Sequence, residues 1–477
     1  MLAKLEGVTL RTYEPGTLTH GYMPAEMPAL ELAYVSAELQ PEVRQLDPEA
    51  TDLPMGVDGR GFRFADIDGE GLPGIAAEID GTLHYKTPSG DGRFGVLQPR
   101  QRQATTAKLG LGAELRDVDG DGRLELATNE GYYMRRASGD ELVGFVAYET
   151  RPNIDFSDPN LQRIDLDGDG YLDLLIARDD GFHWYPSKGA DGWGKPVFVP
   201  RPPSEREGPS LVFADGTGTI FWADMTGDGL TDLVRVTHGG VSYWPNLGHG
   251  RFGRQVTMGG DVHLASWDEF DPAFVRLGDL DGSGTADLVY LDGRGARVWP
   301  NLSGNAFAEP VRLHAFPGVD AATAVEIVDL YGKGTACLVW STASDWAAPS
   351  KVWVLELLPE KPHLLVSVKN GLGMETRLQW EASTQQYLRD REGGRPWVTR
   401  LPFPVQVVTR VEQYDAVARR RFVQQYAYHH GFYDGVEREF RGFGMVERWD
   451  TEAFEDFTHD GLFSLELSET VEENLHQ

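Results

Sequence analysis

The chain alternates short apolar segments with polar turns rich in glycine, and this pattern repeats several times. An apolar segment follows each acidic turn, as at residues 174–177, 233–236 and 288–291. A glycine turn comes next, and then a second segment that carries a large aromatic residue, as at residues 182–186. Segments of this length between Gly and Pro residues are typical of β-strands. The pattern predicts antiparallel meanders, with aromatic side chains packed between neighbouring sheets.

The acidic turn is a nine-residue motif with acidic residues at positions 1, 3, 5 and 9 and glycine at position 6. Its most complete copy contains Asp165, Asp167, Asp169 and Asp173. The six copies begin at aspartates that are 51, 48, 59, 55 and 50 residues apart, namely Asp66, Asp117, Asp165, Asp224, Asp279 and Asp329. Repeats of roughly 40–50 residues with several short strands each are typical of propeller blades. We therefore expect an all-β chain with a β-propeller of about six blades at residues 56–350.

The segments on either side of the repeats have different patterns. Residues 1–55 contain short alternating segments and are interpreted as lead-in strands, and closure of the ring by these strands is one arrangement open to the chain. After residue 350 the acidic turn is absent and longer alternating segments follow, beginning with residues 352–357. We expect a second, antiparallel β region at residues 351–477. Within it, the polar segment 385–396 is expected to be a loop, and residues 466–477 a frayed end.

Charge and cysteine content restrict the classes of function. The chain has 44 Lys and Arg against 74 Asp and Glu, a net charge of −30, which argues against binding to nucleic acid or to an anionic membrane. No run of apolar residues is long enough for a transmembrane helix, and the first residues lack the apolar core of a signal peptide. The one cysteine, Cys337, excludes an intrachain disulfide.

The acidic turns are candidate Ca²⁺ sites, because Ca²⁺ prefers six to eight oxygen ligands and a tight turn can bring carboxylates together. The candidate ligands come from the second, third and fifth turns: Asp117, Asp119, Asp121 and Glu125; Asp165, Asp167, Asp169 and Asp173; Asp279, Asp281, Ser283 and Asp287. The alternative is an Asx-type turn that needs no ion. Calcium is favoured for the second and third turns and balanced against the metal-free turn for the fifth. It is disfavoured for the first and fourth, and the sixth, with Tyr331 and Cys337 at positions 3 and 9, should hold none.

Candidates for catalysis are weaker. His429 and His430 are adjacent in a strand-like segment, so their side chains should point to opposite faces, with one packed and one exposed. The chain has no Gly-x-Ser-x-Gly, P-loop or His-Glu-x-x-His motif, and Cys337 is expected to pack in the core. We therefore expect no enzymatic activity.

The repeats resemble FG-GAP/VCBS units of integrin-type propellers, and several other segments resemble the B component of insecticidal toxin complexes. The latter are residues 13–16, 21–25, 53–59, 329–340, 370–376, 401–412 and 428–444, the last reading Tyr-His-His-Gly-Phe-Tyr-Asp-Gly-Val-Glu-Arg-Glu-Phe-Arg-Gly-Phe-Gly. The resemblance covers nearly the whole chain and corresponds to the middle of that family, a propeller followed by the start of an Rhs-like shell.

This resemblance implies a structural function rather than catalysis. In that family the propeller docks the B–C shell onto the pentameric A channel and gates it, and the shell encloses a toxic C-terminal cargo. It implies A (channel) and C (cargo) partners, and action outside the cell after a cytoplasmic stage, without a recognisable signal peptide. The chain would be a fragment, a split subunit or a relic, since most of the shell is missing. Two alternatives stay open: a carbohydrate-binding or adhesion propeller that uses Trp184 or Trp244, and a propeller glycosidase or lyase.

Overall fold

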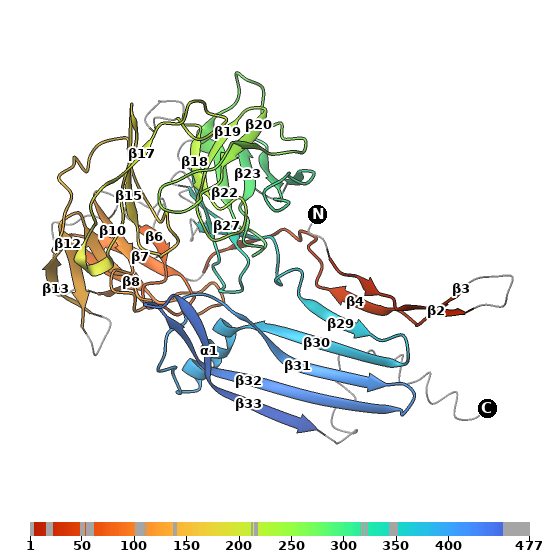
Figure 1. Cartoon of the computed structure of the whole chain (residues 1–477). Coiled ribbons are helices and arrows are strands. Elements are labelled where there is room, and N and C mark those ends of the chain that lie inside the picture. The colour runs from red at the N-terminus through yellow and green to blue at the C-terminus, as the bar shows by residue number, and fades with distance from the viewer. Residues whose placement is uncertain are drawn as a thin grey trace.

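The computed structural model describes residues 4–15, 22–47, 53, 62–100, 109, 112–136, 141–210, 213, 218–314, 316, 319, 323–342 and 352–451. The expected C-terminal fraying at 466–477 and most of the 53–59 segment lie outside these residues. The described chain forms a six-bladed β-propeller and a separate antiparallel sheet that lies below it in Figure 1. The all-β fold class is thus confirmed. Among the described residues, no helix has both the length and the hydropathy that a membrane span requires.

Each blade is a four-stranded antiparallel sheet. The strands of the first three blades are β6 (Phe62–Ala65), β7 (Gly74–Ile79), β8 (Thr82–Lys86) and β9 (Gln98–Pro99); β10 (Ala113–Arg116), β11 (Glu125–Thr128), β12 (Gly131–Arg135) and β13 (Leu142–Ala147); β14 (Leu161–Ile164), β15 (Asp173–Arg178), β16 (Gly181–Tyr185) and β17 (Val197–Pro200). Those of the next two are β18 (Ile220–Ala223), β19 (Asp232–Thr237), β20 (Gly240–Trp244) and β21 (Val256–Thr257); β22 (Val275–Gly278), β23 (Asp287–Asp292), β24 (Gly295–Trp299) and β25 (Val311–Leu313). Two short 3₁₀ turns, Gly189–Asp191 and Pro272–Phe274, lie in the connections.

The sixth blade closes the ring with a strand from the lead-in segment. Its strands are β26 (Thr323–Val328), β27 (Cys337–Thr342), β28 (Val352–Glu356) and β5 (Glu42–Gln45). β5 pairs antiparallel with β28, so that Val43 lies opposite Leu355. The lead-in segment therefore closes the ring through β5, which is the arrangement that the sequence left open. The expected boundary at residue 350 was wrong, because Val352–Glu356 belongs to the ring and not to the second β region. Its side chains Val352, Val354 and Leu355 are all at most 1% exposed and pack between blades.

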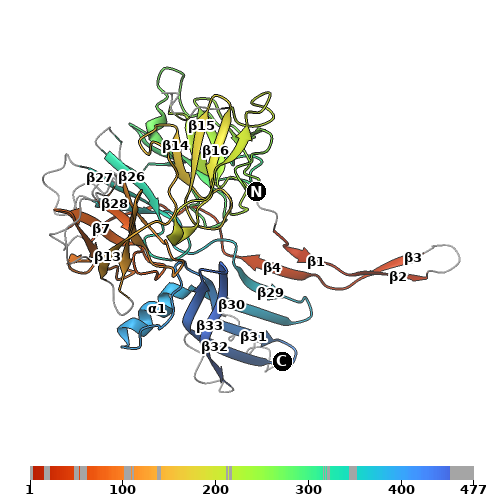
Figure 2. The ribbon, with the colours of Figure 1, turned by 60° about the vertical axis from the view of Figure 1, so that its left-hand side comes forward.

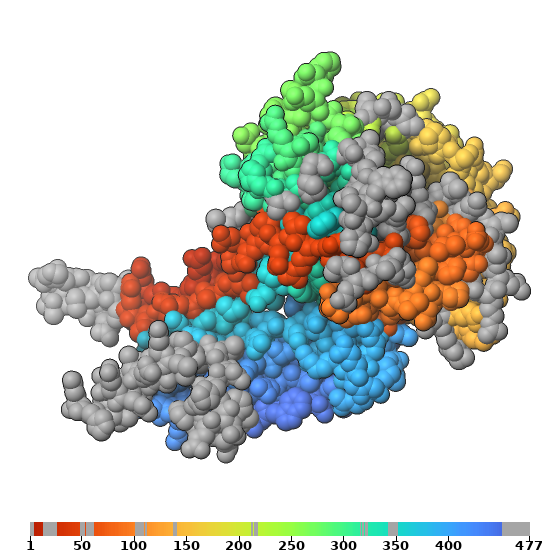
Figure 3. All heavy atoms as spheres, turned by 180° about the vertical axis from the view of Figure 1, so that it is seen from behind, coloured from red at the N-terminus to blue at the C-terminus, as the bar shows by residue number. Residues whose placement is uncertain are grey.

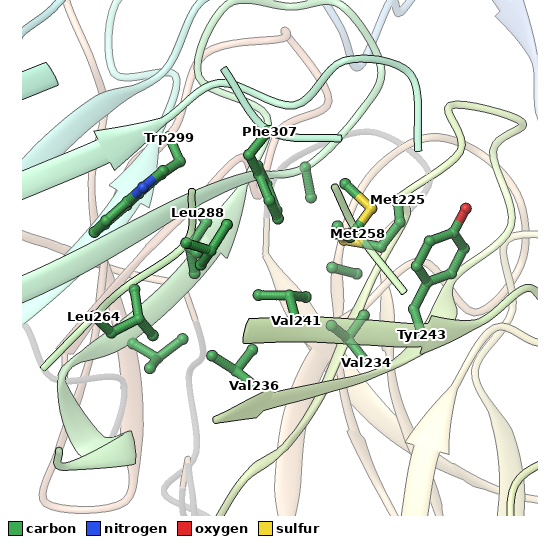
Figure 4. Packing of buried hydrophobic residues seen from close by; sticks show 14 of the residues in the cluster. Met225, Val234, Val236, Val241, Tyr243, Met258, Leu264, Leu288, Trp299 and Phe307 are labelled. Atoms are coloured by element: carbon green, nitrogen blue, oxygen red, sulfur yellow. The ribbon is translucent and has the colours of Figure 1, made fainter. Parts of the chain in front are cut away.

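Neighbouring blades share buried apolar clusters that hold the ring together. Between the fourth and fifth blades, one buried cluster contains Val234, Val236 and Tyr243 together with Leu288 and Trp299 (Figure 4). Trp299 is fully buried, as is Trp244 in the fourth blade. Comparable clusters join the fifth blade to the sixth and the sixth to the first. The aromatic residue that recurs in the third strand of several blades is thus an interblade wedge, as its period predicts.

The second β region is a seven-stranded antiparallel sheet in the order β1-β4-β29-β30-β31-β32-β33. Its strands are β1 (Gly7–Val8), β4 (Leu30–Tyr34), β29 (Leu365–Lys369), β30 (Met374–Ala382), β31 (Gln406–Asp415), β32 (Arg420–Asp434) and β33 (Glu439–Thr451). The lead-in segment thus contributes to both parts of the molecule, and Figure 3 shows it running between the ring and the sheet. The hairpin β2 (Arg11–Pro15) and β3 (Tyr22–Glu26) extends away from the body (Figures 1 and 2).

The segment expected to be a loop at 385–396 is mostly helical instead. Helix α1 (Ser383–Glu392) follows β30 directly and lies beside the ring in Figure 2. It buries Tyr387 and Leu388 together with the polar Gln386 and Asp390. Because these polar side chains find tertiary partners, their burial overrides the low hydropathy that predicted a loop.

Candidate functional site

The six acidic turns, loops 1 to 6 (residues 66–74, 117–125, 165–173, 224–232, 279–287 and 329–337), connect the first and second strands of the blades. All six therefore lie on one face of the ring, which we call the loop face. In loop 3, Asp165 accepts hydrogen bonds from the amides of Gly168 (2.8 Å) and Gly170 (2.6 Å). Both glycines have positive φ, +77° and +75°, a conformation that favours glycine.

Every loop keeps this hydrogen-bonded turn, whatever its other residues are. Asp329 of loop 6 accepts from the amides of Lys333 (2.9 Å) and Gly334 (2.6 Å). Equivalent pairs of bonds reach Asp66, Asp117, Asp224 and Asp279. The first aspartate therefore fixes the turn through its own hydrogen bonds, as an Asx-type turn does.

The acidic residue at position 9 begins the second strand and is buried. Asp173 accepts from the amides of Leu166 (3.2 Å) and Ser187 (2.6 Å) and from Trp184 Nε1 (2.8 Å). Glu125, Asp232 and Asp287 likewise accept from the amide that follows the first aspartate of their loops. These bonds tie the loop to its blade.

Burial leaves several of these carboxyl groups poorly compensated. Burial raises the pKa of Asp173 to about 7 despite its hydrogen bonds, and neighbouring Asp167 raises it further. Burial likewise raises the pKa of Asp287 to about 8 and the pKa of Glu125 to about 8, and other loop aspartates add to both. A bound cation would favour the ionised form of each group.

Three loops bring carboxylate oxygens close enough to share an ion. The groups are Asp117, Asp119 and Glu125; Asp165, Asp167 and Asp173; and Asp279, Asp281 and Asp287, with ligand atoms within 4.8 Å of one another. These are positions 1, 3 and 9 of loops 2, 3 and 5, and hard carboxylate oxygens suit Ca²⁺. The residues present therefore fit a calcium ion in these loops.

The residues at position 5 are not part of these groups. Asp121 forms an ion pair with Arg123 at 2.6 Å. Asp169 accepts from the amide of Tyr171, and the Ser283 hydroxyl lies 3.0 Å from that of Thr285. Three protein carboxylates and not four would therefore approach an ion in each loop.

Loops 1 and 6 contain or contact protein cations. In loop 1, Asp68 pairs with Arg100 at 2.8 Å and with Arg135 at 3.6 Å. In loop 6, Lys333 Nζ lies 2.7 Å from Glu356, which is 6% exposed. Arg135 also lies 3.8 Å from Glu125 of loop 2, so protein cations are placed at loop 6 and around loops 1 and 2.

The loop face is also where the ring meets its own second β region, which the sequence did not indicate. Glu70 of loop 1 accepts a hydrogen bond from Tyr387 of α1 and pairs with Arg391 at 3.3 Å. In loop 6, the Lys333 carbonyl accepts from Gln406 Nε2 at 2.6 Å.

The hairpin between β32 and β33 reaches loops 2 and 3. A Cβ on Gly435 would lie 1.7 Å from the carbonyl oxygen of Gly120, so the two backbones are in direct contact. The guanidinium of Arg438 stacks on the Tyr171 ring at 4.4 Å. Gly435 and Arg438 belong to the distinctive 428–444 segment. That segment could have indicated a special role for the hairpin, but not that it contacts loops 2 and 3.

The histidine pair has a packing role. His429 is buried and its Nδ1 lies 2.5 Å from Asp390 Oδ2 of α1, which also accepts from Trp397. His430 is half-buried and accepts from the amide of Val398 through Nδ1. The pair therefore fastens α1 and the following segment to the sheet.

Comparisons with known proteins agree with this architecture. Residues 301–464 match the family described as the insecticide toxin TcdB middle/N-terminal region, and residues 224–290 match the FG-GAP-like repeat. No curated protein matches the chain.

Solved structures of toxin complexes cover nearly the whole chain. A chain in the Tc holotoxin pore of Photorhabdus luminescens is 28% identical, with a TM-score of 0.77, over 94% of this chain and 21% of that chain. Chains in the TcdB2-TccC3-Cdc42 and TcdB2-TccC3 structures are 27% and 28% identical, with TM-scores of 0.66 and 0.65 over 95% and 94% of this chain. Each match spans only 22% of the TcdB2-TccC3 chains.

The sequence resemblance is thus confirmed: this chain is similar to the B component of Tc toxins, through the TcdB family match over residues 301–464 and through its fold over 94% of its length.

Proposed function

We propose that the chain is a structural, non-enzymatic component of a Tc-type toxin-delivery complex, whose propeller docks on a channel-forming partner and gates it. The observation that carries this proposal is the similarity over 94% of the chain to a chain of a Tc holotoxin pore. Because this chain spans about a fifth of that relative, its partners and its activity are part of the proposal. By the same similarity it would act outside the cell and would also meet a cargo component such as TccC3.

The arrangement of the two parts supports docking through one face of the ring. The loop face is occupied by α1, the β32–β33 hairpin and β31 of the same chain. The opposite face carries the tight turns between second and third strands, such as Asp179 and Asp180 in the third blade, which are exposed. This face is therefore available to a partner.

The carbohydrate-binding alternative loses its main support. Trp184 is 5% exposed and Trp244 is fully buried, so neither ring can stack on a sugar. Trp184 donates to Asp173 and Trp244 donates to the Glu205 carbonyl, which are structural bonds.

The docking proposal is tested with a channel-forming A component in lipid bilayers. We expect the immobilised chain to capture this component in the presence of Ca²⁺, and the captured chain to change the conductance of the channel. Asp179→Lys with Asp180→Lys should weaken capture at least about tenfold, since close charge pairs at an interface contribute several kcal/mol. Val417→Lys, at a turn of the sheet that is 81% exposed, is the control. Failure to capture any channel component would sink the proposal.

We also propose that loops 2, 3 and 5 bind Ca²⁺ as a structural ion. The carboxylate groups of these loops and the raised pKa values of Asp173, Asp287 and Glu125 support it. The ion would cross-link the loop to its strand and add to the hydrogen bonds that already form the turn. Isothermal titration with CaCl₂ after chelator treatment should show saturable binding, and heat signals equal to those of buffer alone would exclude it.

A further inference from the structure

The fifth blade contains two arginines in an arrangement that weakens a sheet. Arg297 of β24 and Arg312 of β25 are directly opposite each other in the antiparallel pairing. Like charges at opposed positions destabilise a strand pair, and a local rule is broken most often where a protein has a function to serve. Burial lowers the pKa of Arg297, the Asp292 carboxylate partly offsets this, and the Arg312 charge lowers the pKa further.

These arginines line a cleft on the face of the ring opposite the loop face. The cleft has a volume of about 680 Å³, and its apolar lining includes Leu264, Phe274 and Tyr290. Three arginines line it, Arg294, Arg297 and Arg312. In a chain with a net charge of −30, such a concentration of positive charge is unusual.

Arg297 is held in a fixed position. It donates to the carbonyl oxygens of His263 and Leu264 and lies over the rings of Tyr290 (5.6 Å) and Trp299 (5.1 Å). Asp292 approaches it only to 3.8 Å. The guanidinium therefore supplies a fixed positive charge at the base of the cleft.

The other two arginines are exposed. Within the described part of the chain, the side chains of Arg294 and Arg312 form no hydrogen bond and no ion pair. The two acids of the cleft have other partners within it, since Asp292 accepts from the Arg294 amide and lies 3.8 Å from Arg297, and Glu269 accepts from Ser266. The donors of Arg294 and Arg312 are thus available to a ligand from outside.

The rim adds a feature typical of protein interfaces. Trp267, next to the lining residue Ser266, is 81% exposed. Among the large apolar side chains of the described residues only Val398 is more exposed, and Val417 is equally exposed. Trp and Arg are among the residue types that carry most binding energy at protein interfaces, and here an exposed Trp and two exposed Arg lie beside apolar lining residues.

We propose that this cleft binds a carboxylate-bearing segment of a protein partner, with Arg294 and Arg312 contacting its carboxylates and Trp267 its apolar side chains. The choice of a protein segment rests on the proposed docking function, whereas the preference for an anion does not. Guanidinium groups bind carboxylates through paired, charge-assisted hydrogen bonds, which would also relieve the repulsion between Arg297 and Arg312.

The test measures binding of a short fluorescent peptide of alternating Glu and Phe residues to the full chain by fluorescence anisotropy. We expect Arg312→Gln and Arg294→Gln each to weaken binding about tenfold, and the affinity to fall with added salt. Arg312→Gln should leave the Tm unchanged or raise it, because it removes a like-charge pair. Arg251→Gln, an exposed arginine on the loop face, is the matched control and should change neither value.

Several outcomes would overturn the assignment. These are an affinity of Arg312→Gln within twofold of the unmodified chain, an equal loss for Arg251→Gln, or a fall in Tm that accompanies the loss of binding. Tighter binding of a sulfated oligosaccharide through the same arginines would replace the protein ligand with a glycan. If the variants lose the peptide but still capture the channel component, docking stands and only the role of this cleft in it fails.

Discussion

Loops 3 and 6 have the same backbone turn and neutralise its charge in different ways. In both, the first aspartate accepts two backbone amides at nearly equal distances, 2.8 and 2.6 Å at Asp165 and 2.9 and 2.6 Å at Asp329. At position 9, however, loop 3 has a buried aspartate with three hydrogen bonds and loop 6 has a buried cysteine. Loop 6 instead contains its own cation, Lys333, paired with Glu356.

The acidic residues of the motif have two separate functions. The aspartate at position 1 makes the turn, and it is needed with or without an ion. The acidic residues at positions 3 and 9 create a surplus of negative charge, which an ion or a protein cation must offset. Loop 6 lacks these acids and so needs no ion.

Substitutions at position 9 are expected to give the largest difference in unfolding free energy between loops 3 and 6. Asp173→Ala would leave three donors without a partner, two backbone amides and Trp184 Nε1, at a cost of about 3–5 kcal/mol of unfolding free energy. Cys337→Ala removes only a small buried group and should cost about 1 kcal/mol. Denaturant unfolding of both variants measures the difference, and equal losses would show that position 9 has the same role in both loops.

The second largest difference between loops 3 and 6 is expected in the stabilisation of the folded chain by Ca²⁺. If loop 3 binds the ion, saturation at a hundred times the Kd stabilises the folded chain by about 2.7 kcal/mol per site. Asp167→Asn should reduce this gain and leave the stability in chelator nearly unchanged, since Asp167 makes only a 3.4 Å bond to an amide. Asp228→Asn in loop 4, outside the three carboxylate groups, is the control. An unchanged calcium effect in Asp167→Asn would exclude loop 3 as the site.

Position 1 should show equal effects in the two loops. Asp165→Asn and Asp329→Asn each keep one acceptor and lose the other, which should cost about 1–2 kcal/mol in chelator. Thermal unfolding in chelator gives both values. A much larger loss at Asp165 would mean that the ion, and not the hydrogen bonds, forms the turn.

The smallest effect is expected at the ion pair of loop 6. Lys333→Met should cost about 1 kcal/mol, because Lys333 is one-third exposed and Glu356 keeps Arg44 at 3.6 Å. A double-mutant cycle with Glu356→Gln isolates the pair energy. A coupling near zero would show that Lys333 is not the functional equivalent of an ion.

Much of the fold could be predicted from the sequence because one pattern, an acidic turn followed by short strands, is repeated. Six copies of one turn, each followed by strands with a fixed aromatic position, predicted the ring and the packing of Trp244 and Trp299. A repeat does not show where the last unit ends, however. Residues 352–356 alternate like any strand, and only their pairing with β27 and β5 assigns them to the ring.

The candidate site was predictable only in part. The motif singled out positions 1, 3, 5 and 9 as ligands, but position 5 has local partners in the structure, as Asp121 does with Arg123. Helix α1 and the contacts of loops 1, 2, 3 and 6 depend on residues far apart in the chain, such as Glu70 and Tyr387. No local pattern contains that information, and calcium binding itself stays a prediction.

The closing strand β5 has a consequence for how the chain is made. A ribosome synthesises β5 about three hundred residues before its partner β28. During that time the nascent ring is open and β5 is an unpaired strand at one end. Apolar side chains that pack in one cluster of the closed ring, such as Leu46 and Val352, are then exposed. The last blade would therefore form late and set the rate at which the ring matures, and the lead-in segment would be the part most in need of protection from aggregation until then.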